Sequence, residues 1–417
     1  MKVFKFGGAS VKDAQGVENI AKILSLYRGE HIILVISAMG KMTNHFEKLL
    51  QAYIQNEAYT PILEEIESYH LSIANELMPD NQAITSEINQ IFLNLNLFFN
   101  TNKSPKYDFI YDQVVSKGEI LSTKIVSAYL NDAGIDNAWL DARDYIKTDS
   151  TYREGQVNWE ETAHKLQTLN KDKLYIIQGF IGSNDNYFTT TLGREGSDYT
   201  GAILAHCLDA ESLTIWKDVA GVLNADPRYF TDTTKLNHIS YEEAIELAFY
   251  GASVIHPKTL QPLKNKNIPL YVKSFEKPRD SGTVIKVGEL LEPKIPCYIV
   301  KREQHILQIS THSFAFIDEK VIRDVFQHLA EFQLKVNLMQ ISAISLSLCI
   351  EDKFNRLDEA IDHFKEAFKV DLVKDCTLYT VRHYKDTEGI RIPNVENALI
   401  QQIRKSTLQI VVKDESN

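Results

Sequence analysis

Cysteine is scarce in this sequence. Four residues, Cys207, Cys297, Cys349 and Cys376, are scattered over 417 positions and form no Cys-x-x-Cys pair. This spacing argues against a disulfide framework or a zinc site and favours reduced, mostly buried thiols. Long hydrophobic runs are also missing, since no uninterrupted apolar segment approaches the ~20 residues that span a bilayer. The chain starts with a strand-like segment instead of a basic and then apolar leader. We therefore expect a cytoplasmic protein without a membrane partner.

Positive charge is in deficit. The chain has 45 lysines and arginines against 56 aspartates and glutamates, which gives a net charge of −11 and a pI near 5.6. Nucleic acids and anionic membranes both require a basic face, so this balance argues against either as a partner. The apolar fraction of 44% is ordinary for a globular protein, and the length allows two or three domains. Small anionic ligands remain possible where basic residues gather locally.

The stretch KFGGASV, residues 5–11, is such a place. MKVFKF alternates like a strand and VENIAKILSLY has helical spacing, so the two glycines fall on a strand-to-helix turn. Gly7 and Gly8 allow backbone N–H groups to converge on an anion, and Lys5 adds a full positive charge. A phosphate group fits this pattern. A glycine pair at a strand end also occurs without any ligand, so the stretch alone leaves both interpretations open.

The pattern up to about residue 290 predicts an α/β sandwich with a mostly parallel sheet. HIILVISAMG, residues 31–40, is typical of a buried parallel strand. Residues from about 45 to 105 have few glycines and apolar positions at helical spacing, which indicates a helical insertion. Strands and helices alternate in the rest of this region.

A second domain follows a boundary rich in proline, glycine and charge near residues 280–296. Residues 297–417 predict an α+β domain with helices on one face of an antiparallel sheet. The predicted helices cover residues 319–333, 356–368 and 395–405, and strands lie between them.

Two further stretches combine turn residues with charge. TTTLGREGSDYTGAILA, residues 189–205, places Arg194 and Asp198 at a glycine-rich turn that opens a helix. These residues could simply build a turn and cap the helix, although an arginine among glycines suits carboxylate or phosphate capture. WKDVAGVLNADPR, residues 216–228, follows a strand end, where open α/β sheets bind ligands, but composition alone favours a solvated charged loop. Lys258 in HPKTL is by itself most often a surface charge.

Taken together, these blocks closely resemble the aspartate kinase family of the amino acid kinase superfamily. KFGGASV, VISAMGKMTN, SKGEILS, TTTLGREGSDYTGA, WKDVAGVLNADPR, YEEAIELAFYGASVIHPKTL and SGTVI occur in the family's order within residues 1–290. The resemblance implies a three-layer α/β amino acid kinase fold. It also implies transfer of the ATP γ-phosphoryl group to the β-carboxylate of L-aspartate, giving 4-phospho-L-aspartate for lysine, threonine, methionine and diaminopimelate synthesis. Residues 297–417 resemble the family's paired ACT regulatory modules, with the second module shortened, and imply a homodimer or larger assembly.

The resemblance also implies roles for individual residues. Catalysis would depend on Lys5 and Asp198. ATP would be bound by Lys5, Gly7, Gly8, Ser10, Lys217, Asp218, Leu223, Arg228 and Lys258. The substrate side would comprise Ser37, Thr43, Glu119, Arg194 and Ser197, with Glu119 facing the aspartate amine and Arg194 a carboxylate. Mg²⁺ would arrive with ATP, and no metal ligand from the protein is assigned.

Four positions depart from the family pattern. Ala9 and Lys217 replace usual threonines, Glu195 replaces a usual glycine and Leu223 replaces a usual tyrosine. If the turn requires a positive φ at residue 195, Glu195 carries a strain of ~1 kcal/mol or more. Two alternatives therefore remain beside an aspartate kinase: a kinase of another small amino acid such as glutamate, and a catalytically impaired amino-acid sensor.

The regulatory region departs as well. Lysine-inhibited members of the family have a Gly-Phe pair, an aspartate and a Ser-Glu pair that contact the effector, and our alignment places Lys320, Val321, Asn337 and Ala343 at these positions. Two carboxylates that could meet a cationic effector are lost and a lysine is gained. We expect weak or absent inhibition by L-lysine.

Overall fold

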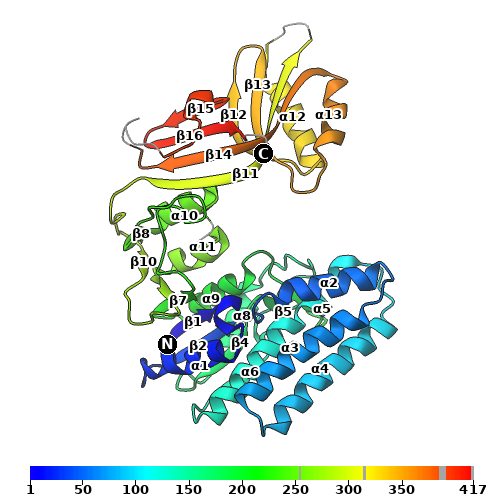
Figure 1. Cartoon of the computed structure of the whole chain (residues 1–417), viewed down its shortest axis with the longest axis vertical. Helices are drawn as coiled ribbons and strands as arrows, with labels where there is room; N and C mark the ends of the chain where they lie inside the picture. The colour runs from blue at the N-terminus through cyan, green and yellow to red at the C-terminus, as the bar shows by residue number, and fades with distance from the viewer. Residues whose placement is uncertain (253–254, 313–315, 385–390, 415–417) are drawn as a thin grey trace. The chain divides into compact units, whose positions relative to one another are not determined.

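The computed structural model describes residues 1–252, 255–312, 316–384 and 391–414 (Figure 1). The chain divides into two compact units. The first unit comprises residues 1–222, 235–245 and 254–293, and the second comprises residues 223–234, 246–253 and 294–417. In the described ranges, none of the helices is both long and apolar enough to cross a membrane.

The first unit is built on an eight-stranded sheet with the order β3-β4-β2-β1-β7-β9-β10-β8. Its strands are β1 (Lys2–Phe6), β2 (Ile32–Ile36), β3 (Ala138–Leu140), β4 (Tyr175–Gln178), β7 (Ser212–Lys217), β8 (His238–Ser240), β9 (Leu270–Ser274) and β10 (Thr283–Lys286). Among the described strand pairs of this sheet, only β9–β10 is antiparallel. The central strands β1, β2 and β4 are almost entirely buried, which explains their continuous apolar character. The predicted mostly parallel α/β fold is confirmed.

Helices cover both faces of this sheet. The helices of this unit are α1 (Ala14–Ser25), α2 (Met42–Ile54), α3 (Thr60–Leu77), α4 (Gln82–Thr101), α5 (Tyr107–Val115), α6 (Lys117–Asp132), α7 (Ala142–Tyr145), α8 (Trp159–Leu166), α9 (Gly196–Cys207) and α11 (Pro257–Asn265), whereas α10 (Tyr241–Tyr250) begins in this unit and ends in the second. Helices α2, α3 and α4 occupy the range of the expected helical insertion, and α3, α4 and α6 lie side by side (Figure 1). The short hairpin β5 (Ile181–Ser183) and β6 (Thr189–Thr191) precedes α9.

Alternation along the strands separates two sets of side chains. Phe4, Phe6 and Trp216 belong to the hydrophobic core that includes residues of α1, α6 and the helical insertion. Neighbouring residues of β1 and β7 therefore point to the opposite face of the sheet. Helix α9 packs against β1 and β7 on that opposite face. This arrangement brings Lys5 under the first turn of α9.

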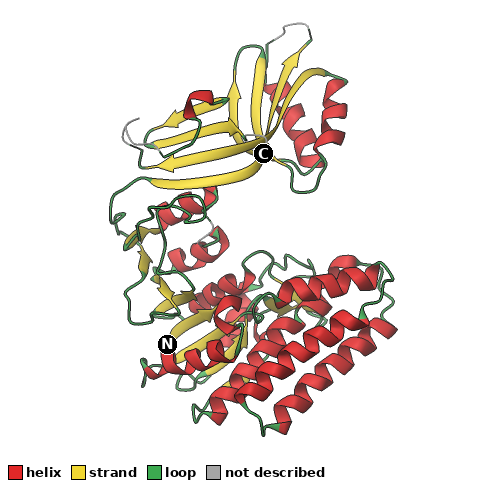
Figure 2. Ribbon diagram, viewed as in Figure 1, coloured by secondary structure: helices red, strands yellow, loops and turns green. Residues whose placement is uncertain are grey.

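The second unit contains a six-stranded antiparallel sheet, β12-β13-β11-β14-β16-β15. Its elements are β11 (Cys297–Thr311), α12 (Glu319–Glu331), β12 (Lys335–Ile341), β13 (Ser345–Glu351), α13 (Leu357–Lys365), β14 (Phe368–Arg382), the 3₁₀ turn η2 (Val395–Asn397), β15 (Ile400–Arg404) and β16 (Thr407–Lys413). Side chains of α12 and α13 share one core with β11 and β13, so both helices cover the same face (Figure 2). The α+β prediction for this region is confirmed.

The predicted helix over residues 395–405 is wrong. The segment forms the turn η2 and then the edge strand β15, in which Ile400 pairs with Val411 of β16. Apolar residues at 395, 399, 400 and 403 fit a helical period, but pairing with β16 supplies backbone hydrogen bonds that a short isolated helix would lack. Ile400 is buried by this pairing, whereas Ile403 stays exposed.

Candidate active site

The central feature of the site is a carboxylate between two lysines. Lys5 Nζ lies 2.6 Å from Asp198 Oδ1, and Lys217 Nζ lies 3.8 Å from Asp198 Oδ2. Lys5 and Asp198 are both almost fully buried. Burial alone would raise the pKa of the Asp198 carboxyl, but the ammonium groups of Lys5 and Lys217 outweigh it and hold the pKa below its usual value. Asp198 is therefore an ionised charge partner and a poor general base.

The glycine turn after β1 is shaped by close backbone contacts. A Cβ on Gly8 would lie 2.6 Å from the carbonyl oxygen of Gly40 and 2.8 Å from that of Ala38, so only glycine fits. A Cβ on Gly7 would lie 3.5 Å from Lys5 Nζ. Because glycine has no Cβ, the space beside the Lys5 ammonium stays open. The N–H of Ser10 donates to the carbonyl of Gly7 at 2.9 Å.

The glycine turn does not lead directly into α1. Residues Gly8–Val11 form the 3₁₀ turn η1, and α1 starts only at Ala14. Asp13 caps α1 by accepting a hydrogen bond from the N–H of Gly16 at 2.8 Å, which delays the helix by several residues. The turn is therefore not the N-terminus of α1. Lys5 and the backbone amides, rather than a helix dipole, are its source of positive potential.

Glu119 lies in the first turn of α6 and is fully buried. Its Oε1 accepts a hydrogen bond from the N–H of Ala38 at 3.4 Å. Its Oε2 has no hydrogen-bond partner among the described residues. Burial raises the pKa of this carboxyl to about 8, although the Ala38 N–H and the charge of Lys5 act in the opposite direction. A buried acceptor without a donor of its own is suited to a cationic ligand.

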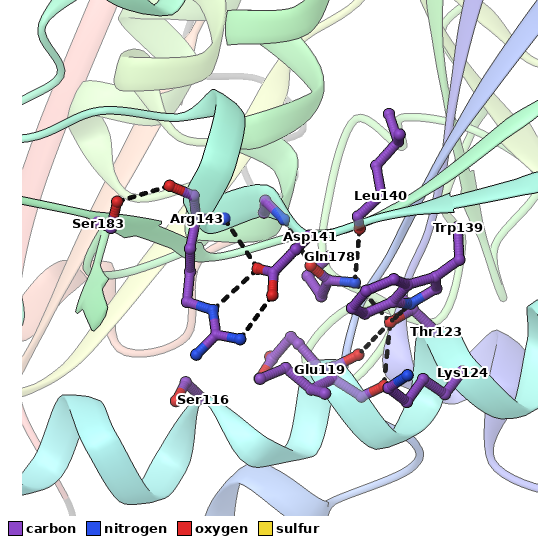
Figure 3. Close-up of polar contacts among 12 residues, drawn as sticks. Ser116, Glu119, Thr123, Lys124, Trp139, Leu140, Asp141, Arg143, Gln178 and Ser183 are labelled. Atoms are coloured by element: carbon purple, nitrogen blue, oxygen red, sulfur yellow. Dashed lines mark hydrogen bonds and ion pairs between the residues drawn. The ribbon is translucent and has the colours of Figure 1, made fainter. Parts of the chain in front are cut away.

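A buried polar network behind Glu119 was not anticipated from the sequence (Figure 3). Thr123 Oγ1 donates to the Glu119 carbonyl at 2.9 Å and accepts hydrogen bonds from Gln178 Nε2 at 2.8 Å and Trp139 Nε1 at 3.0 Å. Gln178 Oε1 accepts from the N–H of Ala142 at 2.7 Å. These bonds tie α6 to β3, β4 and α7 and fix the helix that carries Glu119. In the sequence, the feature that could have indicated this network is Gln178, a polar residue at the end of the apolar run LYIIQ.

The glycine-rich turn before α9 contains two left-handed residues. Gly193 has φ 78°, and Glu195, at the N-cap of α9, has φ 52° and ψ 30°. The φ of Glu195 is therefore positive, and a non-glycine residue in this conformation has a strained backbone. Arg194 is exposed and has no ion-pair partner among the described residues, so Glu195 does not compete for it. Ser197 is buried against Gly179, where a Cβ would come within 2.5 Å of the serine Cβ.

Ser37 and Thr43 lie beside the carboxyl end of strand β2. Ser37 follows β2 directly, and its N–H donates to the carbonyl of Phe6 at 3.1 Å. Thr43 lies in the first turn of α2 and is half-buried. Both positions lie beyond the carboxyl end of β2, where ligands of open α/β sheets bind.

The residues expected to bind ATP do not all fall in one unit. Lys217 ends β7 and is followed by the exposed Asp218. Lys258 lies in the first turn of α11 and lines a cavity of about 510 Å³ between α8, α9 and α11. Leu223 and Arg228 belong to the second unit, where Arg228 Nη2 is paired with Asp226 Oδ2 at 2.5 Å. Within the described ranges no group of three metal-binding side chains occurs.

Comparison with known proteins identifies the family of the chain. The family model described as amino acid kinase family matches residues 1–274. Lysine-sensitive aspartokinase 3 of Escherichia coli (strain K12) is 31% identical over 354 residues, covering 84% of this chain and 78% of the relative. Aspartokinase 1, chloroplastic, of Arabidopsis thaliana is 29% identical over 397 residues, covering 89% of this chain and 68% of the relative. The crystal structure of E. coli aspartokinase III in complex with aspartate and ADP superposes with a TM-score of 0.81 at 27% identity, covering 99% of this chain and 96% of that one.

The fold and the site at the end of its parallel strands define an amino acid kinase. The chain belongs to that family and, within it, to the aspartokinases. The resemblance found in the sequence is thereby confirmed.

Proposed function

We propose that this chain transfers the γ-phosphoryl group of ATP to the β-carboxylate of L-aspartate, giving 4-phospho-L-aspartate and ADP. A carboxylate is ionised near neutral pH, so it attacks phosphorus without a general base. The main barrier is repulsion between two anions, and positive charge at the reacting centre lowers it. The observation that carries the proposal is Lys5, buried beside the open glycine turn with its ammonium 2.6 Å from Asp198.

Substrate recognition would divide between two residues of opposite charge. Glu119 would accept the ammonium group of aspartate through the Oε2 atom that lacks a donor. Arg194 would bind a carboxylate with its exposed guanidinium, for which the left-handed turn at residues 193–195 provides the position. Ser37, Thr43 and Ser197 would line the same site. A zwitterion with an additional carboxylate fits this set of groups.

The nucleotide would be held by its phosphates at Lys5, Gly7, Gly8 and Ser10, and Lys217, Asp218 and Lys258 would be further ATP-binding residues. For Leu223 and Arg228, the resemblance to the family is the support for a role in ATP binding. Mg²⁺ would bind mainly to the phosphates, because the described residues contain no cluster of three metal-binding side chains and Asp198 is already paired with lysines. Bound Mg²⁺ would neutralise charge on the transferred group.

Residues 297–417 would form the regulatory region, with a first ACT-like module and a shortened second one. The two helices α12 and α13 both belong to the first half, and η2 with β15 replaces the helix expected in the second. Exposed apolar side chains on the edge strands β12 and β15, such as Ile341 and Ile403, support assembly into a homodimer or larger oligomer through this region.

A coupled assay of ADP production tests the proposal. Purified protein with ATP and Mg²⁺ should turn over with L-aspartate and should be nearly inactive with L-glutamate or with no acceptor. Hydroxylamine trapping should detect the acyl phosphate only in the first reaction. Equal turnover with L-glutamate would instead support a kinase that accepts several amino acids. No turnover with L-aspartate or L-glutamate would support a catalytically impaired amino-acid sensor.

A further inference from the structure

Asp112 is a buried carboxylate that joins three segments of the first unit. It lies on α5 and is fully buried. Its Oδ2 accepts hydrogen bonds from the backbone N–H of Thr191 at 2.9 Å and of Arg153 at 3.0 Å, and its Oδ1 accepts one from Thr191 Oγ1 at 2.7 Å. Burial raises the pKa of this carboxyl to about 6, which leaves it mostly ionised at neutral pH and able to accept all three bonds. An apolar side chain would fill the same space without the cost of burying a carboxyl group, but it would bind none of these donors.

Two of these segments meet at the turn that carries Arg194. Thr191 ends β6, three residues before Arg194. A Cβ on Gly193 would lie 3.2 Å from the carbonyl oxygen of Arg153, so the loop of Arg153 lies directly against this turn. Asp112 binds the backbone of both segments. Arg194 itself is exposed, and its guanidinium makes no hydrogen bond to a described group, so the backbone of the turn sets its position.

The helix of Asp112 also leads directly to Glu119. Helix α5 ends at Val115 and α6 starts at Lys117, and Ser116 between them has helical backbone angles of φ −56° and ψ −19°. Asp112 and Glu119 are therefore joined by nearly continuous helical backbone, with a rise of roughly 10 Å between them. A single carboxyl group thus connects the helical segment that carries Glu119 with the glycine-rich turn before α9.

We propose that Asp112 is a positioning residue for aspartate binding, because it fixes the spacing between Glu119 and the turn of Arg194. This inference rests on the proposed function, in which Glu119 meets the ammonium group of the substrate and Arg194 meets a carboxylate. A ligand held at both ends binds well only when the spacing of the two protein groups matches its own length. Loss of the Asp112 carboxylate should therefore weaken the binding of aspartate and leave the binding of ATP nearly unchanged.

The competing explanation is a purely structural role, in which Asp112 only stabilises the fold. That role predicts a smaller folded fraction, which lowers the apparent kcat and leaves both KM values unchanged. A positioning role instead raises the KM for aspartate and leaves the KM for ATP unchanged. The two roles also differ in their dependence on Arg194, because a residue that acts through Arg194 matters little once the guanidinium is removed.

The experiment compares the steady-state kinetics of wild type, Asp112→Ala, Asp112→Asn, Arg194→Met and the double variant Asp112→Ala with Arg194→Met. Asp112→Ala should raise the KM for aspartate about 10-fold or more and change the KM for ATP less than about 3-fold. Asp112→Asn should keep the KM for aspartate within about 3-fold of wild type, because its amide oxygen can accept both backbone N–H groups and its nitrogen can donate to Thr191 Oγ1. In the Arg194→Met background, Asp112→Ala should raise this KM less than about 2-fold further.

Thr191→Val decides the question if Asp112→Ala does not fold, because it removes only the hydroxyl bond at 2.7 Å and keeps the two backbone bonds. It should raise the KM for aspartate about 3-fold. Asp352→Ala is the matched control, since Asp352 also accepts two backbone N–H groups, from Arg356 and Leu357 at 2.9 Å, but lies in the second unit. It should leave both KM values at the wild-type level.

Three results would overturn the inference. The first is a folded Asp112→Ala or Thr191→Val enzyme with the wild-type KM for aspartate. The second is an Asp112→Asn enzyme as impaired as Asp112→Ala, and the third is a pair of effects, of Asp112→Ala and Arg194→Met, that multiply fully. Circular dichroism of each variant shows whether it is folded. The proposed function would fail differently, through a wild-type enzyme whose ADP production does not depend on aspartate.

Discussion

The backbone N–H of Ala38 donates to Glu119 Oε1 at 3.4 Å, and this hydrogen bond is the one that the buried carboxylate receives from a described group outside its own helix. Glu119 thus combines burial, a raised pKa of about 8 and an oxygen without a donor. The arrangement is unfavourable for the free carboxylate. A ligand ammonium beside Oε2, as proposed above, would stabilise the ionised carboxylate.

Glu119 should therefore release a proton when aspartate binds. At pH 7 a carboxyl with a pKa of about 8 is mostly protonated, and a bound ammonium would lower that pKa and expel the proton. Calorimetry of aspartate binding at pH 7 in buffers of different ionisation enthalpy should give approximately one proton released, and fewer above pH 9 where the carboxyl is already ionised. Identical enthalpies in all buffers at pH 7 would contradict this assignment.

Glu119→Gln should abolish that proton release and raise the KM for aspartate about 10-fold or more, with little change for ATP. Glu160→Gln is the matched control, since Glu160 is also a first-turn glutamate but is exposed at the start of α8. It should leave both quantities unchanged. If Glu119→Gln altered only the KM for ATP, the assignment of Glu119 to the aspartate amine would be wrong.

Lys5→Met should lower kcat about 100-fold or more, because one positioned charge on the transferring group contributes several kcal/mol to the transition state. The protein should still fold, since Asp198 keeps Lys217 as a partner. Lys2→Met is the control on the same strand, where the lysine pairs with Glu30 at the surface. Steady-state rates and thermal unfolding of both variants check this. Near-normal turnover of Lys5→Met would leave the glycine turn a purely architectural feature.

The sequence predicted the layered fold and named candidate site residues, but it did not predict which of these side chains pair with one another. Apolar runs and glycine turns are local signals, so the strands and the turns at Gly8 and Glu195 could be anticipated. The pairing of Asp198 with both lysines depends on β1 and β7 being neighbours in a particular register, which no local pattern encodes. For residues 395–405 the local pattern was misleading. The apolar residues there are spaced as in a helix, but the segment pairs with β16 as a strand.

Glu195→Gly should stabilise the protein. A non-glycine residue at φ 52° and ψ 30° costs about 1 kcal/mol or more relative to glycine, and the buried Oε2 of Glu195 has no hydrogen-bond partner among the described residues. The free energy of unfolding in urea should therefore rise by about 1 kcal/mol. Asn267→Gly, at φ 54°, is the control, and its gain should be only a few tenths of a kcal/mol because asparagine tolerates this conformation. A loss of stability in Glu195→Gly would show that the side chain makes a compensating contact.

His70 should make the protein sensitive to acid. It is fully buried in α3, where Nδ1 lies 2.7 Å from the Ile66 carbonyl and Nε2 has no partner among the described groups. Burial lowers its pKa to about 4, despite the opposing effect of the Ile66 bond. Above pH 6.5 the ring is neutral in both the folded and the unfolded chain. Between pH 6.5 and 4 only the unfolded chain takes up the proton, so the free energy of unfolding falls by up to ~3 kcal/mol.

Urea unfolding of wild type and His70→Phe at pH 5 and pH 7.5 measures this effect. The variant should lose less stability between the two pH values than wild type, whatever its absolute stability. His164→Gln, an exposed position on α8, should behave like wild type. Parallel pH dependences of wild type and His70→Phe would show that other groups cause the acid sensitivity.

In the second unit, a lysine ammonium lies beside Asn337, one of the positions that our alignment assigns to the effector site. Lys301 Nζ donates to Asn337 Oδ1 at 2.9 Å, and Asn337 Nδ2 donates to the buried Gln304 Oε1 at 2.7 Å. The amide of Asn337 is thus engaged through both its oxygen and its nitrogen. Burial lowers the pKa of Lys301 to about 8, so near pH 7 this side chain is still mostly charged and repels a second cation.

We therefore expect L-lysine to inhibit this enzyme weakly or not at all. Asn337→Asp alone should not create sensitivity, because Lys301 would pair with the new carboxylate, whereas Lys301→Met combined with Asn337→Asp removes that internal competitor and leaves a carboxylate for an external ammonium. Inhibition curves for lysine and threonine, alone and together, on wild type and both variants measure the difference. Threonine serves as the comparison because it lacks a side-chain ammonium. Submillimolar inhibition of the wild-type enzyme by lysine would show that Lys301 and Asn337 do not control the effector site.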